Sequence, residues 1–168
     1  WNLAGNIVYA ACQWCMLIIL AKLTSPGMVG RFALGLAVTA PIIMLSQLQL
    51  RGIQATDAKN EYSFNHYLGL RLISTAVALI IIAGVVAVGG YTREVALVIM
   101  AVGVSKVFES VSDVYYGLMQ RHERMDRIAK SRMLKGPLSL VALGIMVFFT
   151  GEVLWGVIGL AATWGLLL

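Results

Sequence analysis

The chain alternates between long apolar segments and shorter polar stretches. A helix that crosses the hydrocarbon core of a bilayer, which is about 30 Å thick, needs about 20 predominantly apolar residues. Six segments are apolar enough to be such helices, and they lie at 5–23, 32–50, 67–90, 94–119, 133–150 and from about 152 onward. The pattern therefore predicts an all-α membrane protein with about six transmembrane helices.

The composition argues against a water-soluble domain. Hydrophobic residues make up 60% of the 168 residues and charged residues 12%, whereas soluble domains have roughly 45–50% and about 25%. A soluble fold of this size would have to leave much of that apolar surface exposed to water. The low counts of cysteine (two) and proline (three) also exclude a disulfide scaffold and a collagen-like chain.

The two ends of the sequence differ from those of a complete protein. The first residue is Trp1 rather than methionine, and the last apolar segment is still running at Leu168. We therefore expect residues 1–168 to form one transmembrane unit of a longer polypeptide, incomplete at both ends.

The connections between the apolar segments alternate in length and charge. The connections 24–31, 89–93 and 151–152 are short, whereas 51–66 and 120–135 are long. Nine Lys and Arg residues lie in or beside the long connections: Arg51, Lys59, Arg71, Arg121, Arg124, Arg127, Lys130, Arg132 and Lys135. Three lie beside the short ones: Lys22, Arg31 and Arg93. Because cytoplasmic loops carry an excess of basic residues, the charges predict cytoplasmic long connections and a cytoplasmic N-terminus.

The stretch 120–135 carries much of the formal net charge of +5. Basic stretches of this kind can bind nucleic acid or lie on the surface of an anionic membrane. The stretch falls between two apolar segments and contains no Phe, Tyr or Trp on which bases could stack. We therefore expect an amphipathic segment at the lipid surface and no nucleic-acid partner.

Three charged residues lie inside the fourth apolar segment: Lys106, Glu109 and Asp113. At about 100° per residue they fall within a sector of about 60° on one helix face. A charge near the bilayer centre costs about 2.5–3.5 kcal/mol, so these side chains should face protein or water. Two interpretations stay open: a mutually neutralising cluster that fixes the helix in its bundle, or the polar wall of a substrate or ion pathway.

Other chemistry is sparse in this sequence. Arg71, near the start of the third segment, could bind phosphate or extend to the lipid headgroups. His66 and His122 lie in different connections without metal-ligand spacing. The sequence has no Walker A motif, nucleotide-binding glycine loop or catalytic Ser/His/Asp arrangement. We therefore expect no enzymatic activity, catalytic residue, metal or cofactor.

Three blocks of the sequence resemble a known family: LQLRGIQATD at 48–57, FNHYLGLR at 64–71 and KVFESVSDVYYGLMQRHERMDRIAKS at 106–131. Together they are similar to the N-terminal part of bacterial polysaccharide-biosynthesis membrane proteins, the oligosaccharide flippase family. The wider superfamily includes multidrug/cation antiporters and the peptidoglycan lipid flippase. The resemblance implies a transporter of about twelve to fourteen helices in two six-helix lobes, of which this chain would be the N-terminal lobe.

The resemblance also implies a function and a location. The substrate would be an oligosaccharide on a polyprenyl diphosphate, flipped to the outer leaflet of the bacterial cytoplasmic (inner) membrane. The product would feed O-antigen, capsule or exopolysaccharide assembly, and the partners would be this glycolipid, membrane lipids and other polysaccharide-assembly proteins. The positions that match the family's blocks are Arg51, Asp57, Arg71, Glu109, Asp113, Gln120 and Arg121. The match assigns no individual role to Asp57, Gln120 or Arg121.

The residues that we expect to bind substrate or to line its path are Arg51, Arg71, Lys106, Glu109 and Asp113. The hypothesis is that one of the three cations meets phosphate, while the two carboxylates set helix geometry or couple to a cation. Two alternatives to a flippase stay open. One is a cation-coupled exporter of small molecules or drugs from the same superfamily, and the other is a membrane scaffold for glycan assembly that transports nothing.

Overall fold

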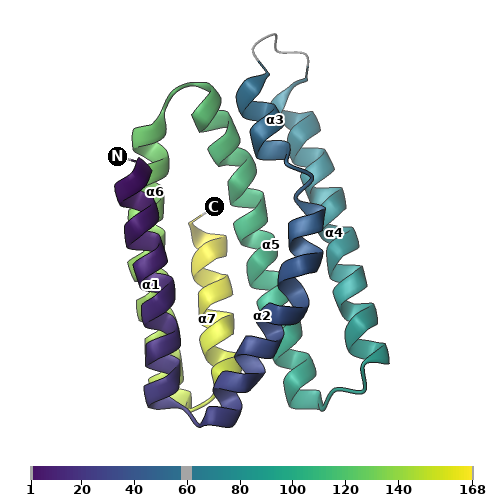
Figure 1. Ribbon diagram of the computed structural model, residues 1–168, viewed down its shortest axis with the longest axis vertical. Helices are drawn as coiled ribbons and strands as arrows, with labels where there is room; N and C mark the ends of the chain where they lie inside the picture. Colours follow the sequence, from purple (N-terminus) through teal and green to yellow (C-terminus); the bar gives the residue numbers. More distant parts are fainter. Residues whose placement is uncertain (1, 58–61, 168) are drawn as a thin grey trace.

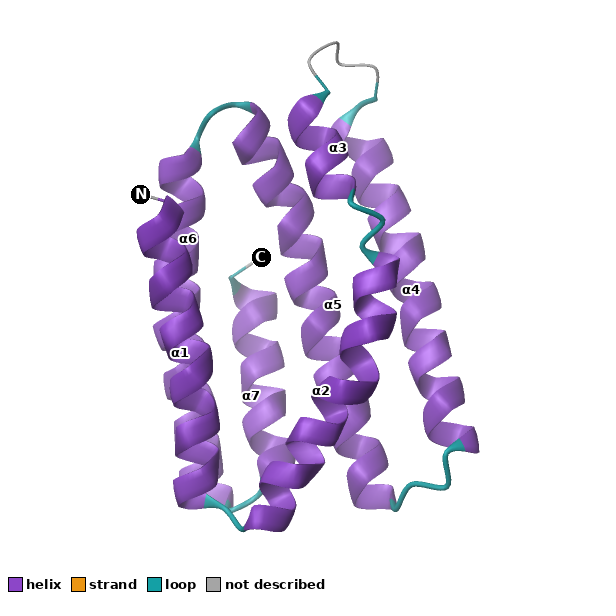
Figure 2. Ribbon diagram, in the orientation of Figure 1, coloured by secondary structure: helices purple, strands orange, loops and turns teal. Residues whose placement is uncertain are grey.

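The computed structural model describes residues 2–57 and 62–167, and every regular element in these residues is a helix (Figures 1 and 2). The helices are α1 (Asn2–Leu23), α2 (Pro26–Ser46), α3 (Leu50–Thr56), α4 (Phe64–Val88), α5 (Arg93–Arg121), α6 (Met125–Thr150) and α7 (Val153–Leu166). The expected all-α class is confirmed.

Five stretches of helix are long and apolar enough to cross a membrane, and they contain α1, α2 with α3, α4, α5 and α6. The sixth expected segment is α7, which has 14 described residues and is shorter than the roughly 20 that a span needs. Large apolar side chains point outward on these helices, as Ile80 and Phe149 do with 70% and 80% of their surface exposed. The chain is a multi-pass membrane protein whose outer surface suits lipid.

The helix α5 lies at the centre of the bundle, where it packs against α2, α3, α4, α6 and α7, while α1 packs along α6 (Figure 1). Single glycines allow these close approaches. A Cβ at Gly5 would lie 2.8 Å from the Cα of Ala129, where α1 meets α6. A Cβ at Gly35 would lie 3.2 Å from Val102, where α2 meets α5. Small residues at such contacts let helix backbones pack closely in membranes.

The connections lie at the two ends of the bundle as their alternation predicts. The α1–α2, α4–α5 and α6–α7 connections lie at one end, and the N-terminus, α3 and the α5–α6 connection lie at the other (Figure 1). The end with the N-terminus therefore carries most of the basic residues that we assigned to the cytoplasm. One of these, Lys59, lies outside the described residues.

The second segment is not one continuous helix to residue 50, as the hydropathy pattern predicts. The helix α2 continues through Pro41 but ends at Ser46, and α3 begins at Leu50. Between them Leu48 and Gln49 adopt left-handed backbone conformations, with φ of 48° and 53°. Such a conformation costs a residue other than glycine roughly 1–2 kcal/mol. A hydropathy pattern cannot detect it, because Leu48 and Gln49 are similar in polarity to the residues around them.

The prediction of a long surface segment at 120–135 is wrong. The helix α5 continues to Arg121, and α6 begins at Met125, so three residues connect them. The turn depends on Glu123, with φ of 57°, and on the backbone N–H of Arg124, which donates to the carbonyl of Met119 at 2.9 Å. The prediction failed because it ended the helices where the residues become polar. Arg, Lys, Gln and Met are polar or flexible but good helix formers, so both helices continue into this stretch.

Candidate functional site

The charged face of α5 forms a polar cluster with side chains from α1, α3, α4, α6 and α7. Lys106 Nζ and Glu109 Oε2 form an ion pair at 2.6 Å, one helical turn apart. The hydroxyl of Tyr9, in α1, donates to Glu109 Oε1 at 2.9 Å. Lys106 Nζ also lies 5.4 Å from the ring centroid of Trp164, in α7. This ion pair is the contact that the neutralising interpretation requires, and its two side chains join α5 to two neighbouring helices.

Asp113 does not join that pair but binds a residue of α3. Arg51 Nη1 lies 3.1 Å from Asp113 Oδ1, and Arg51 Nε donates to Gln120 Oε1 at 3.3 Å. The guanidinium of Arg51 also lies 5.7 Å from the ring centroid of Tyr116. Arg51 therefore connects α3 to α5 through three residues of α5.

Arg71 lies inside the bundle, with 1% of its surface exposed. Its Nη1 donates to the hydroxyl of Ser110 at 3.2 Å, and its Nε has no hydrogen-bond partner within residues 2–57 and 62–167. In the same residues no carboxylate forms an ion pair with it. The alternative that Arg71 extends to the lipid headgroups is wrong, because the bundle encloses its side chain.

A pocket of about 320 Å³ opens beside these two arginines. Its lining residues are Gln47, Gln49, Leu50, Arg51, Gly52, Arg71, Asp113 and Gln120. We call it the arginine pocket. One wall is the break between α2 and α3, and non-helical backbone within a membrane protein is tolerated where it lines a polar cavity or is buried in protein. Two guanidinium groups and one carboxylate face this pocket, so it favours an anion.

A second, smaller pocket of about 110 Å³ lies between α1, α5 and α6. It is lined by Tyr9, Glu109, Ser112, Asp113, Tyr116, Arg132 and Lys135. We call it the lysine pocket. Asp113 lines both pockets.

Sequence reasoning missed Arg132 and Lys135 as members of the site, because it placed them in a connecting loop. Lys135 is 4% exposed, and its Nζ donates to the hydroxyl of Ser112 at 2.6 Å. Arg132 donates to the side chain of Asn6, in α1. Extending the helical period backward from Ser139 would have found them, since positions three, four and seven residues apart share a helix face.

The remaining family-motif positions divide between two places. Gln120 lines the arginine pocket. Asp57 accepts a hydrogen bond from the hydroxyl of Tyr67 at 3.3 Å, and its Oδ2 lies 4.0 Å from Arg121 Nη1. Asp57 and Arg121 thus join the end of α3 to α4 and α5 rather than lining the pocket.

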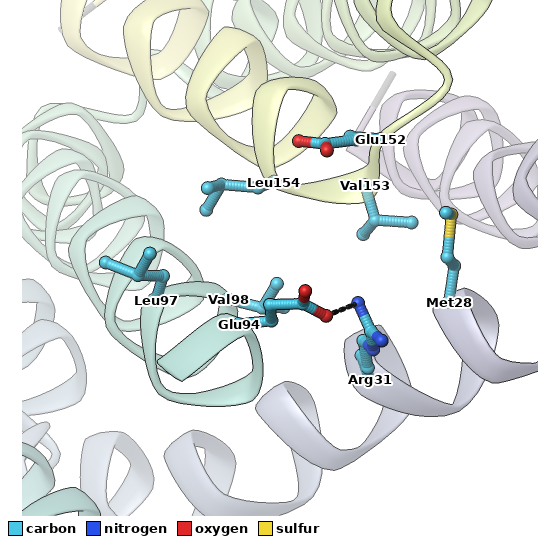
Figure 3. A pocket seen from close by; sticks show the side chains of 8 residues that line it. All are labelled: Met28, Arg31, Glu94, Leu97, Val98, Glu152, Val153 and Leu154. Carbon is cyan, nitrogen blue, oxygen red and sulfur yellow. Dashed lines mark ion pairs between the residues drawn. The ribbon is translucent and has the colours of Figure 1, made fainter. Parts of the chain in front are cut away.

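A third pocket, of about 380 Å³, lies at the opposite end of the bundle (Figure 3). The first residues of α2, α5 and α7 form it, and Arg31 Nη1 pairs with Glu94 Oε2 at 2.5 Å across it. Both side chains are well exposed, at 39% and 68%. Exposed pairs contribute little, typically 0.2 to about 1 kcal/mol, so this pair mainly joins two helix starts.

The polar cluster carries more cationic than anionic side chains, which favours an anion. Five cationic side chains (Arg51, Arg71, Lys106, Arg132 and Lys135) surround two carboxylates (Glu109 and Asp113). In the part of the chain that the structure describes, no three His, Cys, Asp or Glu residues come together as metal ligands. Arginine matches the geometry of phosphate and carboxylate oxygens with paired N–H donors.

Comparison with known proteins gives one informative match. The chain is 32% identical over 146 residues to a protein of Staphylococcus aureus named "Capsular polysaccharide biosynthesis protein CapF". The match covers 87% of this chain but 36% of the relative, so the chain spans about a third of that protein's length. No family model and no solved structure matches the chain. The chain is therefore similar, over most of its length, to one part of a protein named for capsular polysaccharide biosynthesis.

Proposed function

We propose that this chain is the N-terminal lobe of a membrane protein of bacterial surface-polysaccharide biosynthesis. The whole protein would flip an oligosaccharide linked to polyprenyl diphosphate from the cytoplasmic to the outer leaflet of the cytoplasmic membrane. The multi-pass helical fold and the similarity to a capsular polysaccharide biosynthesis protein support this proposal.

The observation that carries the proposal is the arginine pocket. A guanidinium inside a membrane bundle is costly, and such residues usually mark a functional path. Arg71 Nε is buried without a hydrogen-bond partner in the described residues, and Arg51 faces the same pocket. A diphosphate in the pocket would interact favourably with both positive charges.

The surroundings of the pocket also fit an amphiphilic substrate. Gln47 and Gln49, at the break between α2 and α3, provide amide groups along the same wall, where sugar hydroxyls need hydrogen-bond partners. The polyprenyl tail would stay in the bilayer, beside outward-facing side chains such as Ile80. We further propose that the protein moves its substrate without making or breaking bonds, so that it is not an enzyme.

The proposal can be tested in cells that lack the gene. We expect the lipid-linked oligosaccharide to accumulate with its sugar facing the cytoplasm while surface polysaccharide disappears. The full-length gene should restore both, whereas Arg51→Gln and Arg71→Gln variants should reduce surface polysaccharide severalfold at equal protein level. Arg93→Gln is the matched control, because it removes an exposed positive charge at the opposite end of the bundle.

Other outcomes would favour the other functions. Unchanged leaflet distribution and surface polysaccharide, together with raised drug tolerance on expression, would indicate a small-molecule exporter. Loss of polysaccharide on gene deletion, with full rescue by both arginine variants, would indicate a scaffold that needs only its packed fold.

A further inference from the structure

Asp113 lies between two groups of cationic side chains. On one side it pairs with Arg51 at 3.1 Å in the arginine pocket, which Arg71 also lines. On the other side it lines the lysine pocket, together with Arg132, Lys135 and a second carboxylate, Glu109. The three cations Arg51, Arg132 and Lys135 also converge on the ring of Tyr116, with centroid distances of 5.7, 5.4 and 5.9 Å.

We propose that Asp113 is an internal substitute for the phosphate of the ligand. In the empty protein its carboxylate neutralises Arg51. When a diphosphate enters the arginine pocket, it becomes the ion-pair partner of Arg51 and Arg71. The Asp113 side chain then rotates toward Arg132 and Lys135. This inference rests on the proposed function, because it takes the ligand of the arginine pocket to be a diphosphate.

Charge makes the exchange favourable. A diphosphate and a carboxylate a few ångströms apart repel each other strongly in the weakly screened interior of a membrane protein. The lysine pocket, which Asp113 already lines, offers it two further cations, Arg132 and Lys135, and Glu109 lines the same pocket.

The exchange would also change how α3 is held. Arg51 is the charged contact between α3 and Asp113 of α5, and α3 follows the left-handed residues Leu48 and Gln49. A buried side chain of α3 lacks polar partners. Gln54 is 1% exposed, yet neither its amide nitrogen nor its oxygen has a hydrogen-bond partner in the described residues. A buried amide left unpaired costs about 1–3 kcal/mol. Arg51 is thus one of the polar contacts that hold α3, beside the Asp57–Arg121 contact at its end, and losing Arg51 to the ligand would loosen α3.

Titration of the purified full-length protein with inorganic pyrophosphate tests the exchange. Asp113→Asn keeps the size and shape of the side chain but removes the competing charge, so pyrophosphate should bind about tenfold more tightly, which corresponds to about 1.4 kcal/mol. Asp113→Glu restores the competitor and should bind like the wild type. Glu152→Gln is the control for net charge, since this exposed residue lies at the opposite end.

A second measurement follows α3 directly by hydrogen exchange of its amides at residues 50–56. Pyrophosphate should raise their exchange in the wild-type protein, and Asp113→Asn should raise it without ligand. Weaker or unchanged pyrophosphate binding by Asp113→Asn would overturn the proposed exchange. The proposal would also be overturned if neither the wild type nor this variant bound pyrophosphate. The leaflet assay tests flipping independently, so a failure of the exchange is distinguishable from a failure of the proposed function.

Discussion

At the scale of single residues, the sequence located the charges, and the structure decided how each is neutralised. Lys106 and Glu109 are one turn apart on the same helix, so their pairing followed from the helical period alone. The partner of Asp113 is Arg51, 62 positions earlier in the chain. No local pattern could predict that contact, because it depends on how two helices pack.

The residue scale supplies a test of the two interpretations of the Lys106–Glu109 pair. Glu109→Gln removes the carboxylate that neutralises Lys106, and we expect it to lower the free energy of unfolding by about 1–3 kcal/mol, less than for a fully buried pair. Lys106→Met in the same protein should recover part of the loss, because no unpaired charge then remains. Thermal unfolding of the single and double variants measures the coupling.

That cycle also separates structure from transport. If the double variant recovers stability and surface polysaccharide together, the pair only holds helices in place. If stability returns while polysaccharide does not, the pair lies on the substrate path.

At the scale of elements, hydropathy identified the helices, whereas backbone geometry and packing set their ends. The helices α5 and α6 extend beyond their apolar parts, which brings Arg132 and Lys135 into the bundle. The end of α2 and the docking of α3 on α5 depend on close contacts between helices. A Cβ at Gly117 would lie 2.4 Å from the side-chain oxygen of Gln54, so the absence of a side chain at Gly117 lets α3 approach.

The docking of α3 can be tested by filling the space at Gly117. Gly117→Leu should displace α3 and lower the free energy of unfolding by about 1–3 kcal/mol, as overpacking does. It should also weaken pyrophosphate binding, because Arg51 moves with α3. Gly69→Leu, in α4, is the matched control, since nothing lies within 4 Å of a Cβ there. Equal effects of the two substitutions would show that close packing at Gly117 is not what holds α3.

At the scale of the whole molecule, the alternation of connections orients the chain in the membrane. The N-terminus and the α5–α6 connection share one end, and the α4–α5 connection lies at the other (Figure 1). The excess of basic residues at the first end predicts that it is cytoplasmic. This prediction rests on charge, because a helical bundle is compatible with either orientation.

Cysteine labelling in intact cells measures the orientation. In a protein with Cys12→Ser and Cys15→Ser, a membrane-impermeant thiol reagent should label Thr92→Cys from outside. It should label Glu123→Cys only after the membrane is permeabilised. Both positions are exposed residues of connections, so they differ in side of the membrane rather than in burial. Labelling with the opposite sidedness would invert the assignment and place the arginine pocket toward the outer leaflet.

The sequence by itself determined the helical class, the number of apolar segments, the unequal charge of the two ends and the shared face of Lys106, Glu109 and Asp113. These properties depend on hydrophobicity and on the period of one helix, and both are local. Only the tertiary structure decided that Arg71 is enclosed, that Asp113 pairs with Arg51, and that Lys135 is buried beside Ser112. Each of these depends on which helices pack together and how each is rotated, and contacts between segments far apart in the chain set that arrangement.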